Sequence, residues 1–318
     1  MQTSTLPLAI ASAVIAIITT AAPARAQNFH SWVSAAGSGF ACTRAAPCNN
    51  FTVAHEATGA GGVISVLDSG DFFGLAVTKS ITIRAEGVEG GSVIITGGDF
   101  SWITVSAGGS DVVQLEGLHF AGGGIRIDTG GQLHVRNCVI RNNPAVGLNT
   151  SGILFRPNGP GKLVVTDTAV INNGSGATGA GILIQPQAGG SARVHLERVS
   201  VQGNVFGIVA DGTGSTAGIN MTVRDSVSSG NTQDGIIAVT PSGGAPIGVM
   251  VTNTSSSNNT IGIRSIGPNV TVRVDGSSVI GNGTGLSFSG GGALLTFGNN
   301  AVQANGTKGA FSGSVGLE

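Results

Sequence analysis

The sequence predicts an all-β fold, a parallel β-helix solenoid of about nine coils. Three observations lead to this prediction: a glycine that recurs at nearly regular steps, an asparagine that recurs with it, and apolar residues at alternate positions between the two. An aliphatic residue follows the glycine each time, at Gly124, Gly152, Gly181, Gly207, Gly235, Gly262 and Gly285. By subtraction the steps are 28, 29, 26, 28, 27 and 23 residues, and self-similarity with such a period is typical of a solenoid.

Each repeat unit is predicted to be one coil of short strands. Apolar residues alternate with polar ones, as at Leu133 and Val135 or at Val272 and Val274, and a period of two indicates strands rather than helices. Gly, Asn, Ser and Thr tolerate left-handed or locally hydrogen-bonded backbone, so we expect them at the corners between strands. Successive coils would then stack at about 4.8 Å, the spacing of strands in a sheet.

The recurring asparagine is expected to form a ladder along one edge of the solenoid. It occurs at Asn143, Asn173, Asn204, Asn231, Asn259, Asn282 and Asn305. A buried amide must satisfy both donors and its acceptor, and stacking like on like does so. We therefore expect each side chain to bond the amide or backbone of an adjacent coil.

A second column contains charged residues. It reads Asn137, Asp167, Arg198, Asp225 and Asn253 on consecutive coils. Opposite charges on neighbouring strands attract, so we predict that Arg198 forms an ion pair with Asp167 or Asp225.

Residues 1–26 are predicted to be a secretory signal peptide. An apolar run from Leu6 to Thr20 precedes Ala24-Arg25-Ala26, which has the small-x-small form of a cleavage site. A membrane anchor is the alternative, but about 15 apolar residues are short for a span of about 20. We expect a mature chain that begins at Gln27, is secreted or periplasmic, and has no membrane span.

Residues 27–62 are predicted to form an N-terminal cap, and residues 63–318 the β-helix. In an exported chain Cys42 and Cys48, which flank a short loop, are expected to form a disulfide. Residues 49–58 predict a short amphipathic helix, with apolar residues at 51, 54 and 57. A solenoid needs such a cap because its end otherwise exposes core and unpaired strand edges. The first strands are expected at 63–67, 75–77, 81–83, 93–95, 103–105 and 113–120.

The charge composition argues against nucleic-acid binding. The chain has 15 lysine and arginine residues against 16 aspartate and glutamate residues. Lys79, Lys162 and Lys308 are the only lysines, and the sequence contains no basic cluster of the kind that attracts a polyanion.

The N-terminal half carries a resemblance to a known family. The residues concerned are Trp32-Val33-Ser34, the Cys42 to Cys48 loop with the helix after it, Val66 to Phe72, and Lys79 to Ile83. With the repeats, they resemble the exported bacterial right-handed parallel β-helix repeat proteins of the pectin-lyase-like superfamily over nearly the whole mature chain. The resemblance implies right-handed coils of three strands each but no particular chemistry, because a fold alone does not confer an activity.

Enzymatic motifs of that superfamily are not evident in the sequence. Polygalacturonase-like members carry Gly-His-Gly and Arg-Ile-Lys, and neither string occurs here. Asp128 and Asp211 share an outward column but lie three coils, roughly 14 Å, apart, whereas glycosidase carboxylate pairs are separated by about 5 to 9.5 Å. His134 and His195 are two coils, about 9.6 Å, apart, too far to share a zinc ion. We therefore assign no catalytic residue, cofactor or metal.

An apolar stripe on the outside of the glycine-led strands is the candidate docking face. Its outward residues are Arg126, Leu154, Leu183, Val209, Ile237 and Arg264. Soluble monomers seldom expose a patch of this kind. Either the loops at 157–161, 186–191 and 241–246 cover it, or it docks a second subunit or an apolar ligand between the two arginines.

Two functions are compatible with the sequence. The first is an exported non-catalytic scaffold or a module that binds a ligand or a surface component, such as a polysaccharide. The alternative is a polysaccharide lyase or hydrolase whose catalytic residues lie outside the motifs above. Trp102 with Phe100 is the candidate platform for stacking on a sugar, unless Trp102 lies under a loop.

Overall fold

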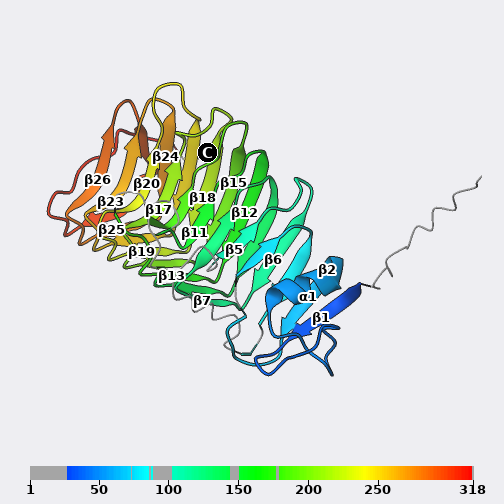
Figure 1. Cartoon of the computed structure of the whole chain (residues 1–318). Coiled ribbons are helices and arrows are strands. Elements are labelled where there is room, and N and C mark those ends of the chain that lie inside the picture. Colours follow the sequence, from blue (N-terminus) through cyan, green and yellow to red (C-terminus); the bar gives the residue numbers. More distant parts are fainter. Residues whose placement is uncertain are drawn as a thin grey trace, which may run out of the picture.

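The computed structural model of the chain describes residues 27–316 except 73, 86, 89–101, 144–149 and 177–178. In this part the chain is a β-solenoid of three parallel sheets, whose successive coils lie side by side along one axis (Figure 1). Sheets 1, 2 and 3 have twelve, eight and nine strands. The predicted all-β solenoid of about nine coils is therefore confirmed. The predicted leader and the predicted strand 93–95 lie outside the described residues.

The strands divide among the sheets as follows. Sheet 1 consists of β1 (Asn28–Val33), β2 (Thr58–Val66), β4 (Ile81–Arg84), β6 (Val112–Glu116), β9 (Gly131–Arg136), β12 (Pro160–Thr166), β15 (Ser191–Glu197), β18 (Ile219–Arg224), β21 (Ile247–Thr252), β24 (Val270–Asp275), β27 (Ala293–Thr296) and β29 (Gly313–Ser314). Sheet 2 consists of β7 (His119–Ala121), β10 (Val139–Arg141), β13 (Ala169–Ile171), β16 (Ser200–Gln202), β19 (Val227–Ser229), β22 (Ser255–Ser257), β25 (Ser278–Ile280) and β28 (Ala301–Gln303). Sheet 3 consists of β3 (Leu75–Val77), β5 (Trp102–Val105), β8 (Gly124–Ile127), β11 (Ile153–Phe155), β14 (Ala180–Ile184), β17 (Phe206–Asp211), β20 (Asp234–Val239), β23 (Ile261–Ile266) and β26 (Thr284–Ser289).

Each regular coil visits the three sheets in turn. Strands β9, β10 and β11 pair in parallel with β12, β13 and β14 of the next coil. One prediction needs correction here, because the segment 113–120 is not a single strand. Gly117 adopts a left-handed backbone with φ of 67° and turns the corner between β6 and β7, a conformation that glycine adopts without steric strain.

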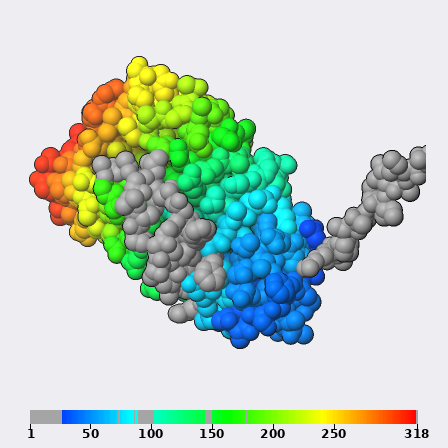
Figure 2. All heavy atoms as spheres, in the orientation of Figure 1, coloured from blue at the N-terminus to red at the C-terminus, as the bar shows by residue number. Residues whose placement is uncertain are grey.

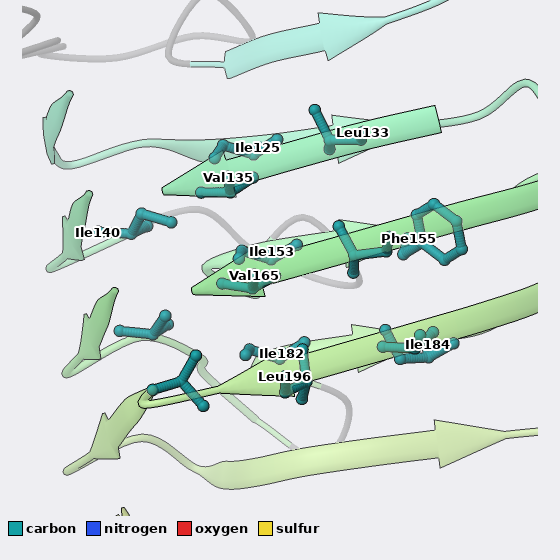
Figure 3. Close-up of a cluster of buried hydrophobic side chains, with 14 of the residues drawn as sticks. Ile125, Leu133, Val135, Ile140, Ile153, Phe155, Val165, Ile182, Ile184 and Leu196 are labelled. Carbon is teal, nitrogen blue, oxygen red and sulfur yellow. The ribbon is translucent and has the colours of Figure 1, made fainter. Parts of the chain in front are cut away.

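The core consists of apolar side chains stacked in columns inside the coils. Leu133 lies opposite Leu163 in the register of sheet 1, and both are fully buried. Figure 3 shows Ile125, Ile153 and Ile182 of sheet 3 stacked from coil to coil and facing the inward side chains of sheet 1. Burying one such side chain contributes about 1.5–3 kcal/mol, so the period-two pattern in the sequence accounts for the interior.

The seven asparagines form a continuous hydrogen-bonded ladder. The backbone N–H of each residue from Asn143 to Asn282 donates to Oδ1 of the next asparagine, at 2.8–3.2 Å. From Asn173 onward, Nδ2 also donates to a backbone carbonyl of the preceding coil, as from Asn204 to Val170 at 3.0 Å. These are the contacts that the repeat alignment predicts.

The recurring glycines are required by the ladder. A Cβ atom at Gly207 would lie 2.9 Å from Nδ2 of Asn231 and 2.3 Å from the carbonyl oxygen of Gly235. Gly181 and Gly262 would meet the amides of Asn204 and Asn282 at the same 2.9 Å. The amide of the next coil thus fills the space beside each glycine, which explains why the two residue types recur together.

The N-terminal end is closed by the helix α1 (Phe51–Ala57) (Figure 1). Asn50 caps it by accepting a hydrogen bond from the Val53 N–H at 2.8 Å. Phe51 is fully buried and its ring packs against Phe72, with centroids 5.4 Å apart. The predicted disulfide between Cys42 and Cys48 is confirmed. The first strands extend into the predicted cap, since β1 and β2 already belong to sheet 1.

Candidate functional site

A groove crosses the outer face of sheet 1 in the middle of the solenoid. Its volume is about 530 Å³, and it extends over five consecutive strands from β12 to β24. Figure 1 labels β12, β15 and β18 as successive strands of this sheet, and in Figure 2 the colours follow the sequence from one end of the solenoid to the other. The outward residues that line the groove are Lys162, Arg193, His195, Asn220, Thr222, Gly248, Met250 and Arg273.

Strand register arranges these residues in two columns. The first column runs Lys162, Arg193, Asn220 and Gly248 on successive coils. The second runs His195, Thr222, Met250 and Arg273. Cationic side chains therefore lie at both ends of the groove, and neutral residues lie between them.

Three cations of the groove are not in ion pairs. In the described part of the chain, five arginines form ion pairs with carboxylates, and Lys162, Arg193 and Arg273 are not among them. Lys162 lies directly opposite Arg193, and like charges at opposed positions repel each other. His134 lies on the coil before the groove, and its pKa is lowered mainly by burial and to a smaller extent by the positive charge of Lys162. The groove thus has a surplus of positive charge that an anionic ligand would balance.

The predicted ion pair of Arg198 lies beside the groove, at the corner between sheets 1 and 2. Arg198 contacts Asp167 with Nε–Oδ1 at 2.6 Å, and its Nη1 lies 2.5 Å from Oε1 of Glu197. Asp225, the other predicted partner, pairs instead with Arg224 at 3.0 Å. The prediction for Arg198 is therefore confirmed with Asp167 as its partner.

The predicted apolar stripe is buried within the chain. Leu154, Leu183, Val209 and Ile237 are 0, 4, 8 and 7% exposed. Trp102 and Ala180 belong to the same cluster, and Phe206, Val239 and Ile266 pack against it. This burial does not match an open apolar face for a second subunit. The residues that pack on the stripe are not from the loops at 157–161, 186–191 and 241–246, so cover by those loops stays a prediction.

The two arginines at the ends of the stripe lie near carboxylates. Arg126 contacts Asp128, with Nε–Oδ2 at 2.6 Å. Arg264 lies 3.8 Å from Asp234, whose side chain is only 3% exposed. Burial raises the pKa of Asp234 to about 6, and the positive charge of Arg264 only partly opposes this shift.

The predicted sugar platform does not lie open on the surface. Trp102 is 7% exposed, and its ring packs so closely on Gly124 that a Cβ there would meet it at 2.8 Å. Phe100 lies outside the described residues. Trp32 is more accessible, and it stacks on His30 with ring centroids 4.0 Å apart.

Further titratable groups occupy structural positions. Burial raises the pKa of the Cys138 thiol to about 12, so this cysteine is a packed corner residue. Within the described residues, no group of three or more metal-ligating side chains comes together. The same part of the chain contains no helix with the length and apolar composition needed to cross a membrane.

Sequence reasoning missed the basic groove. Along the chain, Lys162 is 31 positions from Arg193, which is 80 positions from Arg273. The three residues therefore form no basic cluster in the sequence. Folding places them on one face because each repeat returns to the same sheet. The signal was present in the repeat alignment, where Lys162 and Arg193 occupy the same outward column.

Comparison with family models, with curated proteins and with solved structures gave no match for this chain.

Proposed function

We propose that this protein is an exported, non-catalytic β-helix module that binds an acidic polysaccharide in the groove on sheet 1. The observation that carries the proposal is the convergence of Lys162, Arg193 and Arg273, all outside ion pairs, on one open groove. Positive charges held together without counter-charges are stabilised when an anion binds between them.

The shape of the groove favours an extended polymer over a compact ligand. From β12 to β24 it crosses four strand spacings, about 19 Å. Its floor is the flat outer face of a sheet, and Asn220 and Thr222 offer hydrogen-bonding groups between the cationic ends. A polysaccharide chain with acidic groups can contact both ends at once, and linked contacts strengthen binding.

The role of general acid in a hydrolase is disfavoured for Glu197, the carboxyl group that contacts the groove residue His195. His195 contacts Glu197 with Nε2–Oε2 at 3.2 Å. Hydrogen bonding from His195, together with Arg198 and Arg224, lowers the pKa of this carboxyl group. An acid stabilised in its ionised form is a poor proton donor near neutral pH.

Export is supported by the disulfide between Cys42 and Cys48, because disulfides persist mainly in oxidising compartments. The apolar run and cleavage motif in residues 1–26 point to the same route. Polysaccharides are the abundant extended polyanions outside the cell, whereas nucleic acids lie mostly inside it.

The test is calorimetric titration of the mature chain with oligogalacturonate and hyaluronan oligosaccharides at low and high salt. We expect binding of at least one acidic glycan that weakens with salt, and about tenfold weaker binding for Arg193→Gln and Arg273→Gln, equivalent to about 1.4 kcal/mol. Arg141→Gln, an exposed residue on sheet 2, is the charge-matched control and should bind as the wild type does.

Four outcomes would contradict the proposal. The first is the absence of binding for every acidic glycan, and the second is equal binding by the wild type and the two groove variants. Preference for single-stranded DNA of equal charge would point to a different class of ligand. Release of unsaturated products, followed by absorbance with and without calcium, would show a lyase instead.

A further inference from the structure

We infer that the groove selects acidic glycans in which a neutral sugar separates the charged ones, and that Gly248 creates the neutral subsite in the middle. This inference rests on the proposed function, because it specifies the ligand of the same groove. Its basis is the position of Gly248 and Met250 between the two cationic ends.

The backbone at position 248 does not require a glycine. Because Gly248 has no side chain, the floor of the groove is open at this position. It lies inside β21, paired with Asn220 on one side and Thr271 on the other. A Cβ atom at this position would meet only Oδ1 of Asn220, at 3.3 Å. Gly248 is not among the glycines with positive φ. Glycine weakens a strand, and inside one it often marks a place where a ligand approaches the backbone.

The residues around Gly248 suit an uncharged sugar. Met250, two residues along the same strand, provides a thioether side chain that packs well against apolar C–H groups. Asn220 and Thr222 on the preceding coil can exchange hydrogen bonds with hydroxyl or amide groups. A carboxylate placed here would face only neutral side chains, so it would gain no charge-assisted hydrogen bond from a cation.

The cationic ends are too far apart for acidic groups on one sugar. Arg193 on β15 and Arg273 on β24 are three strand steps apart across the sheet and two residues apart along it, roughly 16 Å between their backbones. Lys162 extends the first end by one further coil. The groove thus matches a polymer that presents an anion, then a neutral unit, then an anion.

The experiment compares two acidic probes on the full mature chain. Hyaluronan oligosaccharides alternate a uronate with a neutral N-acetylated sugar, whereas oligogalacturonates carry a uronate on every sugar. At equal chain length we expect hyaluronan to bind about tenfold more tightly. Gly248→Leu fills the central subsite, so it should weaken hyaluronan binding about tenfold, with a Tm equal to or above that of the wild type. Thr252→Leu, on the same strand but outside the groove, is the matched control and should change neither quantity.

Each outcome bears on the inference. It is overturned if oligogalacturonate binds as tightly as hyaluronan, or if Gly248→Leu binds like the wild type while Arg193→Gln and Arg273→Gln bind weakly. In both cases the proposed function survives. If neither arginine variant changes binding, the proposed function fails as well. Gly248→Thr, a smaller residue that favours strands, replaces Gly248→Leu if the leucine variant does not fold.

Discussion

Arg198 holds Asp167 of the preceding coil through two hydrogen bonds, Nε to Oδ1 at 2.6 Å and Nη2 to Oδ2 at 3.0 Å. Arg198 does so from a left-handed backbone with φ of 49°, which an arginine seldom adopts. Hydrogen bonding from Arg198 is the main cause that lowers the pKa of Asp167. A bidentate contact between neighbouring coils thus offsets an unfavourable backbone conformation.

Replacing Arg198 by Ala is expected to lower the Tm slightly. The pair is largely exposed, so its contribution should fall as salt is added. Arg198→Asn should be less harmful than Arg198→Ala because asparagine tolerates the left-handed backbone. Thermal unfolding at low and high salt measures both effects. A Tm that stays unchanged in Arg198→Ala but drops in Asp225→Ala would mean that the pair with Asp167 contributes nothing.

Asn204→Ala is expected to destabilise the protein strongly. The substitution leaves the buried N–H of Asn173 and the carbonyl of Val170 without their side-chain partners, and each buried unsatisfied group costs about 1–3 kcal/mol. Asn305→Ala should cost less, since Asn305 is the last member of the ladder and is only half-buried. Urea unfolding of both variants compares the two positions. If both variants lose the same free energy of unfolding, the burial of the ladder hydrogen bonds does not determine how much they stabilise the fold.

Leu183→Asp tests the covered stripe. Leu183 is 4% exposed, so an unpaired carboxylate there should destabilise the fold by about 3–5 kcal/mol. Val227→Asp is the control, because Val227 is an apolar strand residue that is 37% exposed. Equilibrium unfolding together with size-exclusion chromatography separates the two readings of the stripe. If the Leu183→Asp variant is fully stable but loses an association that the wild type shows, the stripe is a docking face after all.

The sequence predicted the features that repeat, and it missed those that depend on how repeats line up. Period-two alternation follows from strand geometry, and the Gly–Asn pairing follows from the space that the asparagine amide needs beside the glycine. Both recur in every coil, so the sheets, the core columns and the ladder could be predicted. Burial of Leu183 depends on its packing in a cluster with Trp102 and Ala180, and a repeat alignment, which gives only the outward column, leaves open whether such a stripe is covered. The basic groove depends on the register of residues as distant as Lys162 and Arg273, because it combines charges from several coils.

The last prediction concerns the pH dependence of stability through Asp234. Its pKa in the folded state is about 6, above the ordinary value of 3.8, so between these values the folded protein binds the proton more tightly than the unfolded chain does. By linkage, the stabilisation from the protonated group is present below pH 4 and is lost as the pH rises through 6. Above that pH the buried charge destabilises the fold by on the order of 3 kcal/mol.

Asp234→Asn should therefore raise the free energy of unfolding at pH 7–8 and change it little at pH 4. Asp167→Asn is the control of opposite sign, because the pKa of Asp167 is lowered in the folded state from the ordinary value of 3.8. Its substitution should therefore lower the free energy of unfolding across the whole range from pH 4 to 8, and this loss should fade only as the pH falls below 3.8. Urea unfolding of the wild type and both variants across pH 4–8 gives the two difference curves. A difference curve for Asp234→Asn that is flat across this range would show that the carboxyl group is not held in a low-dielectric environment.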